Sequence, residues 1–390
     1  MKIIIASDSF KGSLSSREVA QAAARGIMSV RPDCEVICMD IADGGEGTAA
    51  TLTEALGGMM VSTEASDPLG RRIRAEYGII DFNGAKTAVI EMSQASGLTL
   101  LTADERNPLL TSTYGTGGLI LDALSRGCRR FMVGIGGSAT NDGGCGMLEA
   151  LGFRFHDKSG KPVTGLCGGR LSDISSIDSS QAVSGVMGSE FIVACDVDTP
   201  FCGPEGAAAV FGPQKGATPE AVAELETGMQ NLNRIIIRDY GTDLSKTAGA
   251  GAAGGLGGAF KAFLGARLER GIDMVLDAAG FEEVIRGADL IITGEGKIDG
   301  QTSRGKVISG IAGRAGRHNV PVMAIAGIVD MDEEEIRNCG LIAALPTGPR
   351  PQNESDLEYA MRPEVASGNI SETVAKALVS LSPSLFRENL

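Results

Sequence analysis

The sequence lacks tryptophan and is poor in other aromatic residues, which brings its aromatic content to 4% of 390 residues. Basic residues are also outnumbered, because 35 Lys and Arg face 49 Asp and Glu and leave a net charge of −14. Nucleic-acid binding needs clustered basic side chains and usually aromatic rings that stack on bases. We therefore expect no nucleic-acid partner, although a local field can still attract an anionic substrate to an acidic protein.

Histidine is nearly absent as well. The two histidines, His156 and His318, lie in no recognisable motif. Proton-transfer chemistry in this chain must then depend on carboxylates and lysines. This composition suits phosphoryl transfer, in which positioning and electrostatic stabilisation account for most of the catalysis.

Long apolar runs are missing too. No run approaches the roughly 20 residues that cross a bilayer, and the N-terminus lacks the apolar segment of a secretory signal. The eight cysteines are scattered, without a CxxC pair or the spacing of a zinc site. In such a chain they are expected to be reduced thiols. We therefore expect a soluble cytoplasmic protein without a membrane partner, and the sequence predicts no oligomeric state.

The length of the chain exceeds what one hydrophobic core usually supports, so we expect two domains. Near the N-terminus, apolar runs at residues 3–5 and 34–41 enclose a helical pattern that opens on a capping box, Ser15 to Glu18. After Asp289 the alternation of strands and helices returns, with strands expected at residues 290–293, 322–326 and 341–345. This alternation is typical of a parallel sheet.

The middle of the chain has a different pattern. Two alternating runs, 71–82 and 85–93, are joined by Asn83-Gly84, the strongest short-range signal for a β-hairpin. Thr218-Pro219 is a typical helix start, with an N-cap followed by a proline in the first helical position. We predict an inserted α/β domain with an antiparallel hairpin at residues 63–283, and a parallel α/β domain made of residues 1–62 and 284–390.

Glycine-rich loops that carry carboxylates and lysines follow three of the predicted strands in the terminal domain. These residues are Asp8 and Lys11, then Asp43 and Glu46, then Glu295, Lys297 and Asp299. Ligands of open α/β sheets bind outside the carboxyl ends of the strands, so the three loops are expected at one edge. Helix capping explains any one of these acids, but explains three such loops less well.

This edge is predicted to bind an anion together with a metal ion. Lysine side chains and the N–H groups of glycine suit phosphate oxygens. Mg²⁺ usually takes one or two carboxylates plus substrate phosphates. The candidate metal ligands are Asp43, Glu46, Glu295 and Asp299.

The third loop, TGEGKIDGQTSRGK at residues 293–306, nearly matches the phosphate-binding P-loop pattern. Val307 stands where that pattern has a Ser or Thr hydroxyl for Mg²⁺, so Glu295 or Asp299 would have to replace that ligand. The candidates for binding substrate or phosphate in this loop are Gly294, Gly296, Arg304 and Lys306.

Two further loops of the middle domain are candidates for phosphate binding. GGSATNDGG at residues 136–144 is polar and has four glycines, which a purely structural turn rarely needs. Its candidate residues are Gly136, Gly137, Ser138 and Asn141. FGPQKGA at residues 211–217 adds Lys215, although a lone lysine in a loop is usually solvated.

One motif is misleading. GAGAAG at residues 249–254 matches the dinucleotide-binding fingerprint, but that fingerprint needs a buried strand before it, and residues 242–247 are polar. We therefore predict no nicotinamide site, and expect these glycines to allow a close approach of the backbone.

Together and in this order, these blocks resemble the bacterial glycerate kinase family of type 1. The blocks are DSFKG at 8–12, DGGEGT at 43–48, GGSATNDGG at 136–144, FGPQKGA at 211–217, GAAGGLG at 251–257 and TGEGKIDGQTSRGK at 293–306. The resemblance spans nearly the whole chain. It implies a flavodoxin-like parallel α/β domain, an inserted α/β domain resembling restriction enzymes, and an active site in the cleft between the two.

The resemblance also implies ATP- and Mg²⁺-dependent phosphorylation of D-glycerate, with 2-phosphoglycerate the favoured product. The candidate catalytic residues are Asp8, Lys11 and Asp196. Lys11 and Arg304 would hold the glycerate carboxylate, and Asp196 or Asp8 would orient the attacking hydroxyl. Lys306 or Lys215 would face ATP. The chain departs from the expected Asn-Pro-Leu at Thr199-Pro200-Phe201, so a contact from that Asn would be replaced by a hydroxyl or lost.

Two alternatives remain open. The first is a kinase for another small hydroxy acid or sugar acid. The second is a non-catalytic regulator that binds an anionic metabolite. Carboxylates beside lysines argue against the regulator, because a passive anion sensor gains nothing from negative charge at its site.

Overall fold

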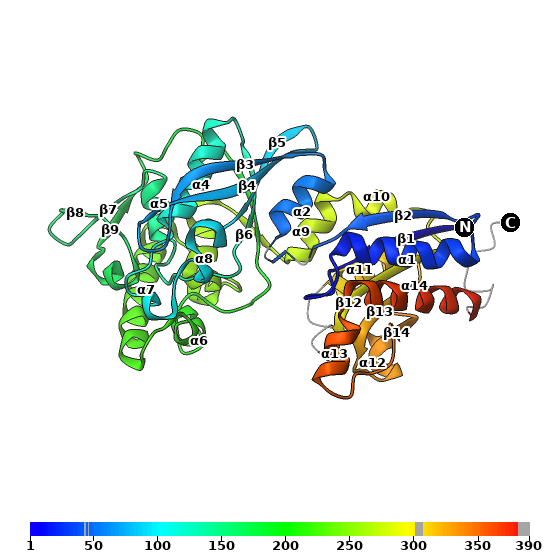
Figure 1. The fold of residues 1–390 in the computed structure, drawn as a ribbon. Coiled ribbons are helices and arrows are strands. Elements are labelled where there is room, and N and C mark those ends of the chain that lie inside the picture. Colours follow the sequence, from blue (N-terminus) through cyan, green and yellow to red (C-terminus); the bar gives the residue numbers. More distant parts are fainter. Residues whose placement is uncertain (43, 46, 301–306, 381–390) are drawn as a thin grey trace. The chain divides into compact units, whose positions relative to one another are not determined.

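The structure is a computed structural model that describes residues 1–42, 44–45, 47–300 and 307–380 (Figure 1). The chain forms two compact units, one from Met1–Asp43 with Val275–Leu390 and the other from Gly44–Met274. Both divisions fall earlier in the chain than the predicted boundaries at 62/63 and 283/284. Helix α2 (Thr48–Ala55) belongs to the second unit because it packs on that unit's sheet. Val284 belongs to the first unit, where Lys2 donates to its carbonyl at 2.6 Å.

The first unit contains a five-stranded sheet in the order β14-β13-β12-β1-β2. Its strands are β1 (Lys2–Ser7), β2 (Glu35–Asp40), β12 (Leu290–Ile298), β13 (Val322–Val329) and β14 (Ala343–Pro346). Every pairing in it is parallel. Numbered along this unit the order is 5-4-3-1-2, which is the flavodoxin-like arrangement. The predicted fold class is confirmed.

The helices of this unit are α1 (Ser16–Val30), α10 (Phe281–Val284), α11 (Val307–Arg317), α12 (Glu333–Asn338), α13 (Glu354–Ala360) and α14 (Pro363–Ser380). Helix α9 (Gly271–Ala278) begins in the second unit and ends in this one. The chain crosses the sheet in opposite directions from β1 to β2 and from β12 to β13, so right-handed connections put α1 and α11 on opposite faces. The predicted capping box opens α1: Ser15 N donates to Glu18 at 2.8 Å, and Glu18 N donates to the Ser15 hydroxyl.

Strand β12 is longer than predicted. It was expected to end at Thr293, but it continues through the first glycines of the loop to Ile298. Gly294, Glu295 and Lys297 pair with Ile325, Ala326 and Ile328 of β13. The pairing with a neighbouring strand therefore overrides the local turn preference of the two glycines.

The second unit is built on a six-stranded mixed sheet in the order β11-β10-β6-β5-β4-β3. Its strands are β3 (Met59–Ser66), β4 (Arg72–Phe82), β5 (Ala85–Glu91), β6 (Arg130–Gly134), β10 (Glu190–Ala194) and β11 (Arg267–Glu269). The hairpin of β4 and β5 is confirmed, with Asn83 and Gly84 at φ values of 53° and 72°, as a type I′ turn requires. From β5 to β11 the neighbours are parallel.

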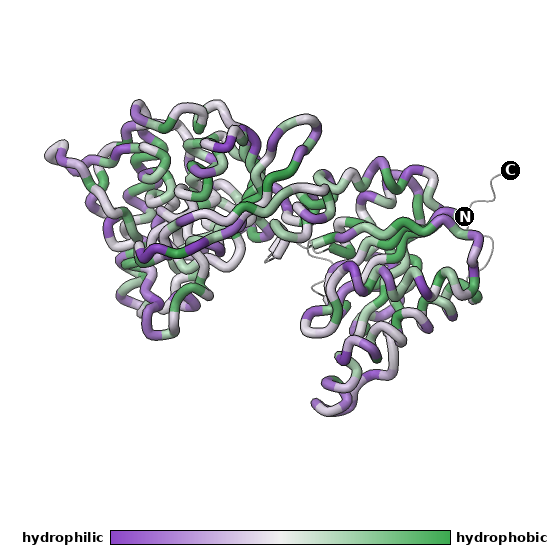
Figure 2. Tube along the Cα trace, turned by 45° about the horizontal axis from the view of Figure 1, so that its top comes forward, coloured by the Kyte–Doolittle hydropathy of each residue, from purple (hydrophilic) through white to green (hydrophobic). Residues whose placement is uncertain are grey.

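A three-stranded sheet and several helices complete the second unit. The small sheet consists of β7 (Arg154–His156), β8 (Pro162–Val163) and β9 (Ser176–Asp178), and the other helices are α3 (Ser93–Ser96), α4 (Tyr114–Ser125), α5 (Cys145–Ala150), α6 (Ala207–Phe211), α7 (Pro219–Tyr240) and α8 (Ala252–Leu264). Helix α7 starts as predicted, since Ala221 N donates to the Thr218 hydroxyl at 3.2 Å. Figure 2 shows hydrophobic residues along the central strands of each unit.

The false dinucleotide fingerprint at residues 249–254 follows a short 3-10 helix and turns, not a strand. Its glycines serve close packing instead. A Cβ on Gly254 would lie 2.0 Å from the carbonyl oxygen of Thr140. The start of α8 therefore packs in direct contact with the backbone of the GGSATNDGG loop. No helix among the described residues is long and apolar enough to cross a membrane.

Candidate functional site

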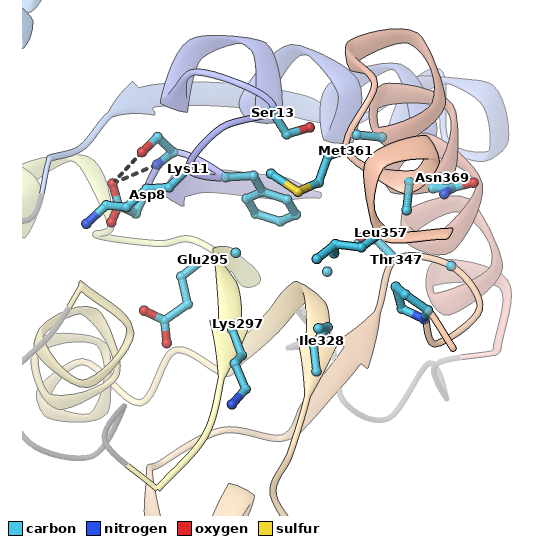
Figure 3. Close-up of a pocket in the computed structure, with 18 of the residues that line it drawn as sticks. Asp8, Lys11, Ser13, Glu295, Lys297, Ile328, Thr347, Leu357, Met361 and Asn369 are labelled. Atoms are coloured by element: carbon cyan, nitrogen blue, oxygen red, sulfur yellow. Dashed lines mark hydrogen bonds between the residues drawn. The ribbon is translucent and has the colours of Figure 1, made fainter. Parts of the chain in front are cut away.

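A pocket of about 380 Å³ lies at the carboxyl ends of β1, β12, β13 and β14 in the first unit (Figure 3). This is the edge at which open α/β sheets bind ligands, and it includes the point between β1 and β12 where the strand order reverses. Asp8 and Lys11 line the pocket from the loop after β1, and Glu295 lines it from β12. Gly296 of β12 lines it as well, so the structure brings four of the predicted site residues to one cavity.

The loop after β1 is tied to β12 by hydrogen bonds. The backbone N–H of Asp8 donates to the carbonyl of Gly294 at 3.0 Å, and the Ser7 hydroxyl donates to the same oxygen at 3.0 Å. One carboxylate oxygen of Asp8 accepts the Ser9 N–H at 2.7 Å. These bonds fix the Asp8 backbone and restrain its side chain, whereas Lys11 is exposed at the pocket edge.

Gly294 and Gly296 of β12 differ in whether packing requires glycine at their positions. A Cβ on Gly294 would lie 2.5 Å from the carbonyl oxygen of Ile325, so strand packing alone requires glycine there. Gly296 lines the pocket, and the nearest atom to a Cβ built there is 3.7 Å away. Packing therefore does not explain Gly296, while it fully explains Gly294.

Glu295 and Asp299, both predicted metal ligands, lie in different surroundings. Glu295 is 7% exposed and lines the pocket. Asp299 forms an ion pair with Lys297 at 3.1 Å and is not among the pocket-lining residues. The hydrogen bond to Asp299 raises the pKa of the Lys297 ammonium above its ordinary value. Of the two carboxylates, Glu295 is the one that lies where it could contact a ligand in the pocket.

Four predicted site residues lie outside the described residues: Asp43, Glu46, Arg304 and Lys306. Within the described ranges, no three His, Cys, Asp or Glu side chains gather as a ready-made metal centre. Mg²⁺ bound with a nucleotide does not need one, because phosphate oxygens and water complete its coordination. The nearly buried carboxylate of Glu295 at the pocket edge fits that kind of ligand set.

The second unit holds a buried polar cluster around Lys215. This lysine is 1% exposed, and its Nζ donates to the Ser138 hydroxyl and the Thr140 carbonyl, both at 2.7 Å. Lys215 is therefore not solvated, as a lone lysine in a loop usually is. Burial lowers the pKa of the Lys215 ammonium to about 7. Lys215 ties the FGPQKGA loop to the GGSATNDGG loop.

Two buried neighbours in the GGSATNDGG loop differ in how well they are hydrogen-bonded. Asp142 accepts four hydrogen bonds at 2.8 to 3.1 Å, from the Thr113 N–H and hydroxyl and from the N–H groups of Gly144 and Gly146. Burial nevertheless raises the pKa of the Asp142 carboxyl. The side-chain nitrogen and oxygen of Asn141 have no partner among the described residues, although the residue is fully buried. Such an amide costs about 1–3 kcal/mol.

The other candidates of the second unit are at its surface. Gly136 and Gly137 follow β6 and are exposed, and the positive φ of Gly137, 72°, suits glycine. Asp196 follows β10 and is exposed, and its carboxylate accepts the Gly271 N–H at 2.9 Å, at the start of α9. The structure therefore shows a capping contact for Asp196 within its unit.

Sequence reasoning missed the apolar side of the pocket. Phe10, Ile328, Leu357 and Met361 line it, together with the amide-bearing Asn369. Leu357 comes from α13 and Asn369 from α14, far from any glycine-rich loop. Only Phe10, inside the DSFKG block, stood next to a recognised signal.

Comparisons with known proteins agree with the resemblance that the sequence blocks indicated. Residues 3–381 match the model of the glycerate kinase family. The chain is 48% identical over 343 residues to a glycerate kinase of Bacillus subtilis (strain 168), covering 88% of this chain and 89% of that protein. It is 43% identical over 343 residues to a glycerate 2-kinase of Escherichia coli (strain K12), with the same coverage, 88% and 89%. A crystal structure described as a glycerate kinase 2 from Salmonella typhimurium LT2 has a TM-score of 0.84 at 43% identity, covering 97% of this chain and 98% of that chain.

Proposed function

The chain belongs to the glycerate kinase family, and from that premise we propose that it transfers the γ-phosphoryl group of ATP to D-glycerate. It is a phosphotransferase that acts on an alcohol group. The favoured product is 2-phosphoglycerate, Mg²⁺ is required, and the cytoplasm, which supplies ATP, is its location. The observation that carries the proposal is the pocket in which Asp8, Lys11 and Glu295 meet at the carboxyl ends of β1 and β12.

Lys11 and Asp8 have the main roles in this proposal. The exposed ammonium of Lys11 pairs with the glycerate carboxylate and places its hydroxyl at the polar end of the pocket. Asp8 orients that hydroxyl and takes its proton late in the transfer, as the hydroxyl oxygen bonds to the γ-phosphorus and the bond from phosphorus to the leaving ADP oxygen breaks. The loose transition state makes little demand on early deprotonation, so Asp8 acts chiefly by position. Asp196 is the second candidate for this role.

Glu295 would hold Mg²⁺, with Asp43 and Glu46 as further predicted ligands. When bound, Mg²⁺ neutralises negative charge on the phosphate oxygens. The protein's own contribution is a carboxylate fixed on a strand and nearly shielded from solvent.

In the second unit we assign an anion-binding role to Lys215, Ser138 and Asn141. Lys215 and Ser138 are already hydrogen-bonded to each other, which fixes both side chains. The unpartnered amide of Asn141 would gain hydrogen bonds on binding a ligand. Gly136, Gly137 and Gly296 would offer backbone N–H groups to phosphate oxygens.

Steady-state kinetics over a panel of acids tests the proposal. The purified chain is incubated with ATP, Mg²⁺ and D-glycerate or other small hydroxy and sugar acids, and ADP formation is followed. D-glycerate should give the highest kcat/KM, and removal of Mg²⁺ by a chelator should abolish turnover. A higher kcat/KM for another acid would favour the alternative kinase. Binding of D-glycerate without ADP formation for any acid would favour the regulator.

A further inference from the structure

The pocket of the first unit has two chemically different ends, and we propose that its apolar end binds the adenine ring of ATP. This inference rests on the proposed function, which requires a nucleotide. Figure 3 shows Asp8, Lys11 and Glu295 toward one end of the pocket, and Leu357, Thr347 and Asn369 toward the other. Met361 and Ile328 lie between these groups and border the apolar end.

The size and lining of the cavity argue for more than a small acid. Glycerate has three carbons, a carboxylate and two hydroxyls, so it has almost no apolar surface to bury. A cavity of about 380 Å³ with apolar walls lies in the size range of sites for larger organic ligands. An aromatic base gains from leaving water against such walls, whereas a polyhydroxy acid does not.

Ile328, Leu357 and Met361 line an open space and are not packed into a core, whereas Phe10 belongs to the hydrophobic core of this unit. Leu357 is 39% exposed on α13, and Ile328 and Met361 are half-buried. Phe10 is 5% exposed and forms the inner wall. A flat ring placed among them would cover the exposed part of Leu357. Methionine suits the edge of such a site, because its flexible thioether adapts to an aromatic ring.

Asn369 supplies a polar group suited to a base. Its carboxamide has both a donor and an acceptor, and adenine presents a complementary pair at N6 and N7. The amide lies against Gly348, where a Cβ would come within 2.8 Å of Asn369 Nδ2. Glycine at position 348 therefore leaves room for the amide at the pocket wall.

The sheet topology sets the direction of the nucleotide. The polar residues Asp8, Lys11 and Glu295 lie where β1 and β12 meet, the point at which flavodoxin-like sheets bind ligands. With the base against α13 and α14, the phosphate chain points toward this end. The γ-phosphate then reaches the residues that the proposed function assigns to phosphoryl transfer.

Calorimetric binding of ADP to the full chain tests the inference without turnover. Leu357→Asp should raise the Kd for ADP about tenfold or more, because it places a charge against the base. Asn369→Ala should raise it several-fold. Tyr359→Ala is the matched control, since Tyr359 is 57% exposed on the same helix and does not line the pocket. This control should bind ADP like the unmodified chain.

Inorganic tripolyphosphate separates the base from the phosphates. Its Kd should be unchanged in Asn369→Ala, which alters no charge, while that variant binds ADP more weakly. Equal weakening of both ligands, or unchanged ADP binding in both pocket variants, would overturn the base site. If Leu357→Asp does not fold, the Kd values of Asn369→Ala for ADP and tripolyphosphate test the base site alone.

The outcomes also separate this inference from the proposed function. Unchanged ADP binding in both variants, with glycerate still phosphorylated, would remove the base site and leave the kinase intact. Selective weakening of ADP binding in a chain that phosphorylates no acid would support the base site and contradict the proposed function.

Discussion

The Nζ of Lys215 donates a hydrogen bond to the hydroxyl of Ser138 at 2.7 Å, although the two residues lie 77 positions apart in the sequence. This bond joins the two loops that carry them. Both residues belong to blocks that had been predicted separately as candidate phosphate-binding loops. The contact makes them one buried polar cluster. Because the ammonium is buried, its protonation affects the stability of the unit.

The pH dependence of the free energy of unfolding should show the lowered pKa of Lys215. Burial lowers the pKa of Lys215 from 10.5 to about 7, so between these values the unfolded chain binds a proton that the folded chain does not. The contribution of Lys215 to the free energy of unfolding therefore rises with pH across this window, by up to about 1.4 kcal/mol per pH unit. Below pH 7 the folded lysine is protonated and its burial cost is fully present.

Urea denaturation of the unmodified chain and of Lys215→Met at a series of pH values from neutral to alkaline measures this effect. The difference in unfolding free energy between the two should change with pH in favour of the unmodified chain. Lys261→Met, at an exposed position on α8, should follow the unmodified chain at every pH. Parallel curves for the unmodified chain and Lys215→Met would show that Lys215 keeps an ordinary pKa.

Lys11→Ala should lower kcat/KM with D-glycerate about a hundredfold or more, because the variant loses the charge that binds the glycerate carboxylate and positions its hydroxyl. The melting temperature should hardly change, because Lys11 is exposed. Lys158→Ala, an exposed lysine in a loop of the second unit, is the control. Near-normal kcat/KM in Lys11→Ala would remove Lys11 from the catalytic residues.

Glu91 should stabilise the second unit through α2. Its carboxylate accepts the N–H groups of Ala49 at 2.8 Å and Gly47 at 3.2 Å, at the start of that helix. Glu91→Gln keeps the shape but loses the charge and one acceptor oxygen, so we expect a loss of about 1–2 kcal/mol in unfolding free energy. Glu76→Gln, exposed on β4, should change it by less than about 0.5 kcal/mol. Equal effects of the two substitutions would argue against the cap.

Local signals in the sequence predicted much of the fold. The capping box at Ser15, the hairpin turn at Asn83-Gly84 and the proline start of α7 at Pro219 are all confirmed. Each of these depends on neighbouring residues, so the sequence contains the whole signal. The parallel sheet of the first unit followed from the alternation of strands and helices.

Features that depend on distant residues were missed or misjudged. Strand β12 continues to Ile298 because β13 supplies its partners. Lys215 is buried by residues that no local pattern around it reveals. The apolar wall of the pocket combines Phe10 with Leu357, at opposite ends of the chain. Only the folded sheet brings these residues together.

Two glycine substitutions should have opposite effects on stability. A Cβ on Gly26 of α1 would lie 2.3 Å from the carbonyl oxygen of Ser371 of α14, so Gly26→Ala must force the two helices apart. We expect it to cost about 1–3 kcal/mol. Gly313 is exposed on α11 with nothing within 4 Å of a Cβ, so Gly313→Ala should stabilise the chain by about 0.5–1 kcal/mol. Thermal unfolding that shows a stabilising Gly26→Ala would contradict the close helix packing.

The most direct test of the account identifies the product. The purified chain is incubated with ATP, Mg²⁺ and D-glycerate, and enolase is added without a phosphoglycerate mutase. We expect phosphoenolpyruvate to form in proportion to the ADP, because enolase reversibly converts 2-phosphoglycerate, but not 3-phosphoglycerate, into phosphoenolpyruvate. ADP without phosphoenolpyruvate would contradict phosphorylation at the 2-hydroxyl. No ADP above the level without glycerate would contradict the kinase itself.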